Sequence, residues 1–279
     1  MDKLKWKKKI IIIGKNSFIG SNINIYLQNK FKVININLNQ FKKLKKNQLK
    51  KFDYICNCSV NKKYIHNKYN TKNDIDLQIA NIIKNNKINY IFLSSRKIYK
   101  PKFNTNEKQN PNPIDIYSHN KVITEKTLKK ILGSKLLILR ISNVIGFKIR
   151  KNKRQVNKTF FDNYIESVKN KSEVNYYNLF KDFISIEQLA DYFYYAINKR
   201  LTGKFNVSLG KKIYVKEILG WLNKYNKNKK NFICLKTPKT LINKTSFTLN
   251  NNKIYKLIKY RPSKNELKKF CVNISKSIH

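Results

Sequence analysis

The sequence predicts an α/β fold: a doubly wound parallel sheet with a small mixed lobe at its C-terminal end. Two patterns predict the sheet. Short, continuous apolar runs, such as those at 10–13 and 90–93, are typical of strands buried on both faces. Segments with apolar residues at helical spacing separate these runs. This alternation of strands and helices predicts right-handed crossovers, which put helices on both faces of the sheet.

The elements expected in the first half alternate in order. The expected strands are 8–13, 31–37, 53–57, 90–93 and 135–139. The expected helices are 18–29, 41–49, 74–85 and 115–132. The helix at 74–85 has Ile75, Ile79, Ile82 and Ile83 on one side, whereas the Lys-rich helix at 41–49 has the weakest pattern.

The pattern changes after Gly146, where a basic loop occupies 147–158. The helices expected beyond it are 159–169, 186–199, 215–225 and 265–273, with short strands at 182–184 and 204–207. We therefore expect residues 1–146 to form the sheet domain and residues 182–207 to return to the sheet. Residues 147–279 should form mainly the second lobe.

The charge is strongly one-sided, with 61 Lys and Arg against 15 Asp and Glu and a formal net charge of +46. Only 6 of the 61 basic residues are Arg, and the Lys are spread along the whole chain. A nucleic-acid binder would instead gather its basic residues on one face and favour Arg. The abundance of Lys, Asn and Ile suggests an AT-rich genome, so we expect no specific nucleic-acid partner.

Composition and the lengths of the apolar runs also argue against a disordered, membrane-spanning, secreted or metal-binding protein. Hydrophobic residues make up 41% of the chain, enough for a buried core. No apolar run approaches the ~20 residues of a membrane span, and the run at 10–13 is too short for a signal-peptide core. The cysteines Cys56, Cys58, Cys234 and Cys271 are scattered, and with three His they make a poor metal site. We expect a cytoplasmic protein without a metal.

A glycine-containing turn joins the first strand to the first helix. Such a turn aims backbone N–H groups and the positive end of the helix dipole at an anion. Gly14 permits the turn and Gly20 permits close packing, whereas Ser17 stands where a dinucleotide motif usually has a third Gly. Two Gly at this spacing, in a chain with 7, favour a phosphate cradle over an ordinary turn. The residues expected to line it are Gly14, Asn16, Ser17, Phe18, Ile19 and Gly20.

The second strand ends without the acidic residue that normally holds the adenosine ribose of NAD. Asn35 and Asn37 stand there, with Lys32, Lys42 and Lys43 nearby. The missing carboxylate and the available cations favour a 2′-phosphate, so NADP is slightly favoured over NAD. Asn37 is expected to contact this end of the cofactor.

Further segments follow the turn in a fixed order. They are DYICNCS (53–59), FLSSRKIY (92–99), IYSHNK (116–121), LLILRISNVIG (136–146), KDFI (181–184) and GKFNVSL (203–209). Together with the turn they resemble the extended short-chain dehydrogenase/reductase family over almost the whole chain. That family, with its Rossmann-type cofactor domain, contains nucleotide-sugar epimerases, dehydratases and reductases. The resemblance therefore implies an NAD(P)-dependent enzyme with a nucleotide-sugar substrate.

The resemblance also implies a catalytic set of Ser95, Tyr117 and Lys121. In family members the catalytic Ser or Thr lies four positions before an aromatic residue, as Ser95 lies before Tyr99. Lys121 favours the phenolate of Tyr117, which then exchanges a proton with a sugar hydroxyl or carbonyl. The cofactor carries the hydride. Further cofactor contacts are expected from Asn57, Cys58, Ser59, Ser94, Tyr117 and Lys121.

The Tyr-x-x-x-Lys pattern carries no weight by itself, because it occurs eight times in this Lys-rich chain. Position distinguishes Tyr117 and Lys121. They open the long helix that comes after the fourth strand, behind a Pro-containing loop that follows Ser94 and Ser95. The i, i+4 spacing places both side chains on one helix face.

Two residues are expected to contact substrate. Asn143 follows Arg140 at the carboxyl end of a strand, where family members contact substrate or nicotinamide. Lys181 stands where relatives place an Arg on the substrate diphosphate, and it supplies the charge without the bidentate fork. Arg96 and Lys97 replace the acidic pair that dehydratases of the family usually carry, which counts against 4,6-dehydration.

The expected reaction is 4-keto reduction or epimerisation of a nucleotide sugar for polysaccharide synthesis. Reduction is slightly ahead, because the trimmed nucleotide half resembles dTDP-4-dehydrorhamnose reductases. The alternative is a non-catalytic NAD(P)-binding member with a regulatory or redox-sensing role, against which the intact Ser95, Tyr117 and Lys121 argue. Homodimerisation is implied by resemblance alone. The sequence leaves the sugar and the nucleotide open and gives His66 and His119 no role.

Overall fold

The centre of the computed structural model, which describes residues 7–146, 160–170, 172–226 and 232–278, is a six-stranded parallel sheet. The strand order is β10-β5-β4-β3-β1-β2, so the direction of winding reverses between β1 and β3. The strands are β1 (Lys9–Ile13), β2 (Lys32–Ile36), β3 (Tyr54–Asn57), β4 (Asn89–Ser95), β5 (Leu136–Ile141) and β10 (Gly203–Val207). The predicted doubly wound α/β fold is therefore confirmed.

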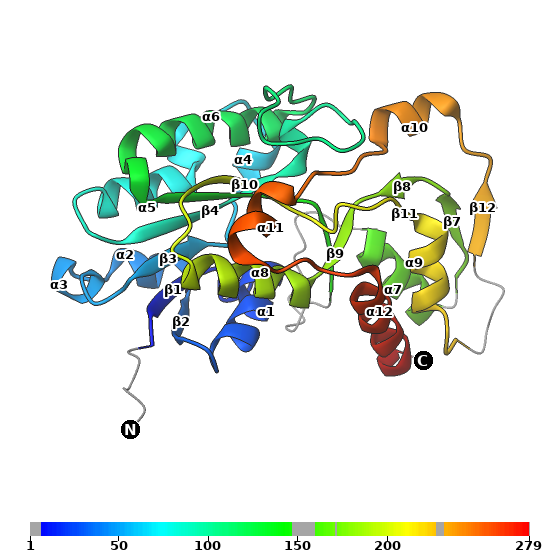
Figure 1. Ribbon diagram of the computed structural model, residues 1–279, viewed down its shortest axis with the longest axis horizontal. Coiled ribbons are helices and arrows are strands. Elements are labelled where there is room, and N and C mark those ends of the chain that lie inside the picture. The colour runs from blue at the N-terminus through cyan, green and yellow to red at the C-terminus, as the bar shows by residue number, and fades with distance from the viewer. Residues whose placement is uncertain (1–6, 147–159, 171, 227–231, 279) are drawn as a thin grey trace.

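Helices cover both faces of the sheet, as Figure 1 shows. On one face lie α1 (Phe18–Leu27) and α8 (Ile186–Asn198). On the other lie α5 (Ile75–Ile83) and α6 (Ile116–Leu132), with the short α4 (Lys62–His66) beside α6. The alternation of side chains along β1 explains both layers, because Ile10 and Ile12 enter one apolar cluster and Ile11 and Ile13 enter the other.

The helix expected at 41–49 is wrong in its bounds, because the segment forms two short helices. These are α2 (Leu38–Lys42) and α3 (Lys46–Leu49). Asn37 begins α2 earlier than expected, since its side chain accepts a hydrogen bond from the backbone N–H of Gln40. Only Phe41 and Leu49 of the two helices are buried, which accounts for the weak sequence pattern.

The second lobe is built from short paired strands and helices to one side of the sheet (Figure 1). The strand pairs are β6 (Asn143–Ile145) with β9 (Phe183–Ser185), β7 (Val174–Tyr177) with β12 (Phe232–Leu235), and β8 (Phe180–Lys181) with β11 (Ile213–Tyr214). The helices of this part are α7 (Phe160–Asn170), α9 (Val215–Leu222), α10 (Lys239–Thr245) and α12 (Lys264–Ile278). The helix α11 (Asn252–Ile258) instead packs beside β10 at the edge of the six-stranded sheet (Figure 1).

Only part of the segment 182–207 returns to the six-stranded sheet. β10 extends it beside β5, and α8 packs on α1. The expected strand at 182–184 forms β9, which pairs with β6 outside the six-stranded sheet, since β10 occupies the edge beside β5. The basic loop at 147–158 lies outside the described residues. Among the helices described, none is long and apolar enough to cross a membrane.

Candidate active site

The glycine turn after β1 is held by Ser17. Its hydroxyl donates to the carbonyl oxygen of Gly14 at 2.8 Å and accepts from the backbone N–H of Gly20 at 3.0 Å. Gly14 has φ +126°, and a β-carbon there would lie 2.8 Å from the Ser17 oxygen. A β-carbon on Gly20 would lie 2.5 Å from the Gly14 carbonyl oxygen. Ser17 thus shapes the turn and begins α1 where a third Gly was expected.

The end of β3 lies against this turn. The backbone N–H of Cys58 donates to the carbonyl oxygen of Ile13 at 2.7 Å, and the Ser59 hydroxyl lies 3.0 Å from the position of a β-carbon on Gly14. Asn57 is buried, and its amide nitrogen donates to Asp76 and to the Ser59 carbonyl oxygen. The Asn57 side chain therefore fixes the shape of the turn that follows β3.

The end of β2 carries two Asn amides and no carboxylate. The Asn35 amide nitrogen donates to the Gly20 carbonyl oxygen at 3.3 Å, while its buried amide oxygen has no hydrogen-bond partner. The amide oxygen of Asn37 caps α2. A glycine turn with no room for β-carbons, beside an unsatisfied buried amide, fits a dinucleotide whose phosphates approach the backbone closely.

Ser95 and Tyr117 line one hollow of about 900 Å³ at the carboxyl end of the sheet. Ser95 is the last residue of β4, and its hydroxyl accepts from the backbone N–H of Lys97 at 3.2 Å. Tyr117 lies in the first turn of α6, which Asp115 caps. Other side chains around this hollow are Val60, Ile65, His66, Lys97, Ile114, Asp115 and Ile116.

Lys121 is buried one turn further along α6. Its ammonium donates to the Leu93 carbonyl oxygen at 2.9 Å and lies 5.8 Å from the centre of the Tyr117 ring. The same nitrogen is 3.9 Å from a carboxylate oxygen of Asp76. Helix α6 and the end of β4 thus bring Ser95, Tyr117 and Lys121 to one edge of the sheet.

Two residues at this edge escaped the sequence analysis. His66 lines the hollow beside Ser95 and Tyr117, although no role was expected for it. Asp76 is fully enclosed near Lys121, and burial raises the pKa of its carboxyl. Asp76 shares the apolar face of α5 with Ile79 and Ile83, and a carboxylate at such a position was the available signal.

Two expected ligand contacts each carry a buried side-chain polar atom without a hydrogen-bond partner. They are Ser94, an expected cofactor contact at the end of β4, and Asn143, an expected substrate contact at the start of β6. Lys181 closes β8 and is partly buried. Burial lowers the pKa of Lys181, and Arg96 and Lys97 lower it further. A bound anion would best compensate the positive charges of Lys181, Arg96 and Lys97.

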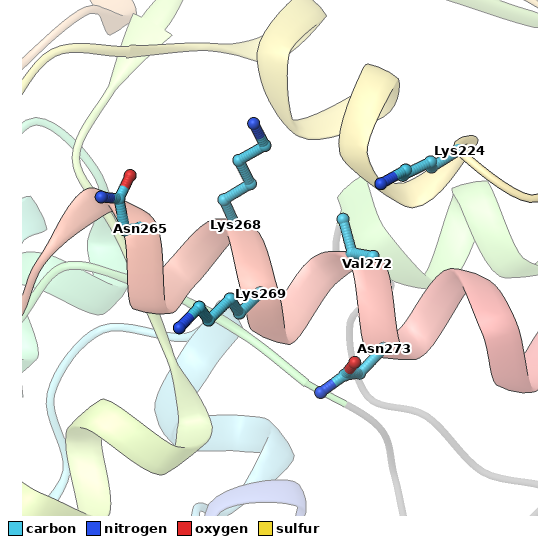
Figure 2. A pocket seen from close by; sticks show the side chains of 6 residues that line it. All are labelled: Lys224, Asn265, Lys268, Lys269, Val272 and Asn273. Carbon is cyan, nitrogen blue, oxygen red and sulfur yellow. The ribbon is translucent and has the colours of Figure 1, made fainter.

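A second hollow, of about 430 Å³, runs along α12. It is lined by Lys224, Asn265, Lys268, Lys269, Val272 and Asn273. Figure 2 shows that the side chains of Lys224, Lys268 and Lys269 point in different directions and do not converge on one point. The described residues of this lining include no carboxylate, thiol or imidazole, so the hollow that contains Ser95 and Tyr117 is the stronger candidate for chemistry.

The fold and the glycine turn define a Rossmann-type α/β protein. The chain belongs to the NAD-dependent epimerase/dehydratase family, whose model matches residues 10–208. This match confirms the family predicted from the motifs. Among curated proteins, no sequence matches the chain.

Solved structures with the same fold cover nearly the whole chain. UDP-N-acetylglucosamine 4-epimerase from Methanobrevibacter ruminantium M1, in complex with UDP-N-acetylmuramic acid, is 20% identical with a TM-score of 0.78 and 97% coverage of both chains. dTDP-glucose 4,6-dehydratase from Bacillus anthracis, in complex with NAD, is 14% identical with a TM-score of 0.75 and 96% coverage of both. UDP-glucuronic acid 4-epimerase from Bacillus cereus, in complex with NAD, is 16% identical with a TM-score of 0.74; 97% of this chain and 96% of that chain are covered.

Proposed function

We propose that the protein is an NAD(P)-dependent enzyme that epimerises or reduces a nucleotide sugar at C4. The observation that carries the proposal is the grouping of Ser95, Tyr117 and Lys121 where β4 ends and α6 begins. The phenol of Tyr117 exchanges a proton with the sugar oxygen, and the Ser95 hydroxyl binds the same oxygen. Lys121 supplies a positive charge 5.8 Å from the centre of the Tyr117 ring. The bound nicotinamide supplies hydride transfer.

The cofactor proposal rests on the chain's own residues. The turn from Gly14 to Gly20 would hold the diphosphate, and the residues at 57–59 and Ser94 would line the remainder of the cofactor. The absence of a carboxylate at the end of β2 favours NADP, whereas the solved relatives from Bacillus anthracis and Bacillus cereus contain NAD. Titration with NADPH and NADH decides between them.

The remaining parts of the proposal concern organisation. Residues 1–146, with the segment 182–207, would bind the cofactor, and residues 147–279 would mainly bind the substrate. Asn143 and Lys181 are the proposed substrate contacts. We further propose a cytoplasmic homodimer that serves polysaccharide synthesis, with reduction and epimerisation both open.

Substituting Tyr117→Phe tests the function. Activity should fall by about 10²–10⁴-fold, because the proton donor is lost, while NAD(P)H binding measured by fluorescence should stay unchanged. Tyr225→Phe is the matched control, since Tyr225 begins another Tyr-x-x-x-Lys match and is 42% exposed. Full activity in Tyr117→Phe would contradict the assignment. A wild-type protein that binds NAD(P)H but turns over no nucleotide sugar would support the non-catalytic alternative.

A further inference from the structure

Two thiols meet where β3 ends. Cys56 lies within the strand and is buried, whereas Cys58 follows the last strand residue and is half-buried. Side chains two residues apart in an extended chain point to the same side, and the two sulfur atoms are 3.8 Å apart. Both thiols are free, and among the described residues no other two thiols are in contact. The pair is therefore a candidate site of oxidation.

The backbone at this point is compatible with a disulfide. Two residues along a strand span about 6.6 Å, near the upper end of the range of about 4.4–6.8 Å between the Cα atoms of bridged cysteines. Bond formation requires the sulfur atoms of Cys56 and Cys58 to approach by about 1.8 Å. Cys56 is held within β3, so Cys58, which lies beyond the strand, should make most of this movement.

A movement of Cys58 reaches the glycine turn, because the two are in contact. The backbone N–H of Cys58 donates to the carbonyl oxygen of Ile13 at 2.7 Å, directly before Gly14. A β-carbon on Gly20 would lie 3.1 Å from the Cys58 β-carbon, and one on Gly14 would lie 3.1 Å from the Cys58 carbonyl carbon. The shape of the turn, and with it the direction of the N–H groups that would face a phosphate, therefore depends on where Cys58 lies.

We propose that Cys56 and Cys58 are an oxidation site, at which a hydroperoxide produces an intrachain disulfide that weakens cofactor binding at the glycine turn. The formation of the disulfide depends on the two thiols alone. Its effect on binding rests on the proposed function, because that function places the cofactor diphosphate at this turn.

Burial assigns the two thiols different parts in the reaction. Burial raises the pKa of the Cys56 thiol, so the half-buried Cys58 is the better nucleophile. The Cys58 thiolate attacks the hydroperoxide; an S–O bond forms, the O–O bond breaks, and the alcohol leaves after taking up a proton. The Cys56 thiol then attacks the sulfenic acid, so that the S–S bond forms and the hydroxyl group leaves with the thiol proton as water. The two thiols are oxidised by two electrons, and the hydroperoxide is reduced.

The test treats the reduced protein with hydrogen peroxide and measures two quantities. The number of thiols that react with N-ethylmaleimide under denaturing conditions should fall by two, and peptide mapping should assign both to Cys56 and Cys58. The affinity for NAD(P)H, measured by fluorescence titration, should fall at least about 10-fold, which corresponds to about 1.4 kcal/mol. Dithiothreitol should restore both values.

Three variants separate the disulfide from other oxidation. Cys56→Ala removes the partner thiol, so peroxide should leave its affinity for NAD(P)H within about 2-fold of the reduced value. Cys56→Ser serves the same purpose if alanine at this buried position prevents folding. Cys271→Ala is the matched control, because Cys271 is also a buried thiol, and it should respond to peroxide as the wild-type protein does.

Three results would overturn the inference. The first is that Cys56 and Cys58 both stay reactive after peroxide treatment, and the second is a disulfide that leaves the affinity for NAD(P)H unchanged. The third is an equal loss of affinity in Cys56→Ala, because oxidation of Cys58 alone would then be the cause. A reduced wild-type protein that binds no NAD(P)H contradicts the proposed function and the effect on binding, while the thiol count still decides whether the disulfide forms.

Discussion

Helix α6 carries two buried ion pairs that differ in how completely they are closed. Glu125 and Arg140 form a tight pair, in which two guanidinium nitrogens donate to the two carboxylate oxygens at 3.0 and 2.5 Å. One turn earlier on the same helix, Lys121 approaches Asp76 no closer than 3.9 Å and donates one hydrogen bond, to Leu93. The two pairs are equally hidden, since each charged side chain is at most 8% exposed.

The difference separates a structural pair from one suited to chemistry. Arg140 also donates to the Tyr99 hydroxyl, which donates to Asn206, so this network ties β5 to β10 and to the loop before α6. Lys121 has three N–H donors and uses one of them on Leu93. It therefore keeps donors for a cofactor or substrate group at the sheet edge. A closed pair fixes the fold, whereas an open one remains available to a ligand.

Breaking the closed pair should produce the largest loss of stability. Glu125→Gln leaves the buried Arg140 guanidinium without its anion, and the free energy of unfolding should fall by about 3–5 kcal/mol. Urea denaturation measures this loss, and Glu173→Gln, at an exposed position, should change the value by less than about 0.5 kcal/mol. NAD(P)H affinity should not change. A loss below about 1 kcal/mol would show that the pair is replaceable.

Breaking the open pair should affect activity more than stability. Asp76→Asn removes the anion beside Lys121, an interaction of about 1–4 kcal/mol at this distance, depending on the local dielectric. The acidic limb of the pH–activity profile should change, because burial raises the pKa of the Asp76 carboxyl above its usual value and Asn cannot titrate in its place. Asp53→Asn, at an exposed position, is the control. An unchanged profile in Asp76→Asn would mean that Lys121 acts independently of this carboxylate.

The sequence predicted what local patterns determine and missed what packing creates. The Ile run of β1 and the turn at Gly14 and Gly20 follow from neighbouring residues, so their positions could be derived. Tyr117 and Lys121 could be picked from eight matches only by their place after the fourth strand. Asp76 and His66 reach the site only because α5 and α4 pack beside α6, a contact between segments far apart in sequence. The strand β9 was found, but its partner β6 was not, since pairing depends on which strand occupies the sheet edge.

Asp182 is a further buried acidic residue, and no described Lys or Arg forms an ion pair with it. Its carboxylate accepts from the backbone N–H groups of Leu209, Gly210 and Leu249 at 2.9–3.1 Å, which ties the second lobe to the segment after β10. Burial outweighs these donors and raises its pKa from 3.8 to about 7.

Between pH 4 and 7 the folded state therefore retains a proton that the unfolded state has lost. The stability contributed by the protonated carboxyl is complete below pH 4 and should decline as the pH rises to 7, by at most about 1.4 kcal/mol per pH unit. Asp182→Asn should remove this part of the slope in denaturation curves, whatever its effect on absolute stability, while Asp53→Asn should keep it. An identical slope in wild type and Asp182→Asn would show that the three backbone donors hold the carboxylate ionised throughout. Asp182 would then resemble the closed pair on α6, with backbone N–H groups in place of the guanidinium.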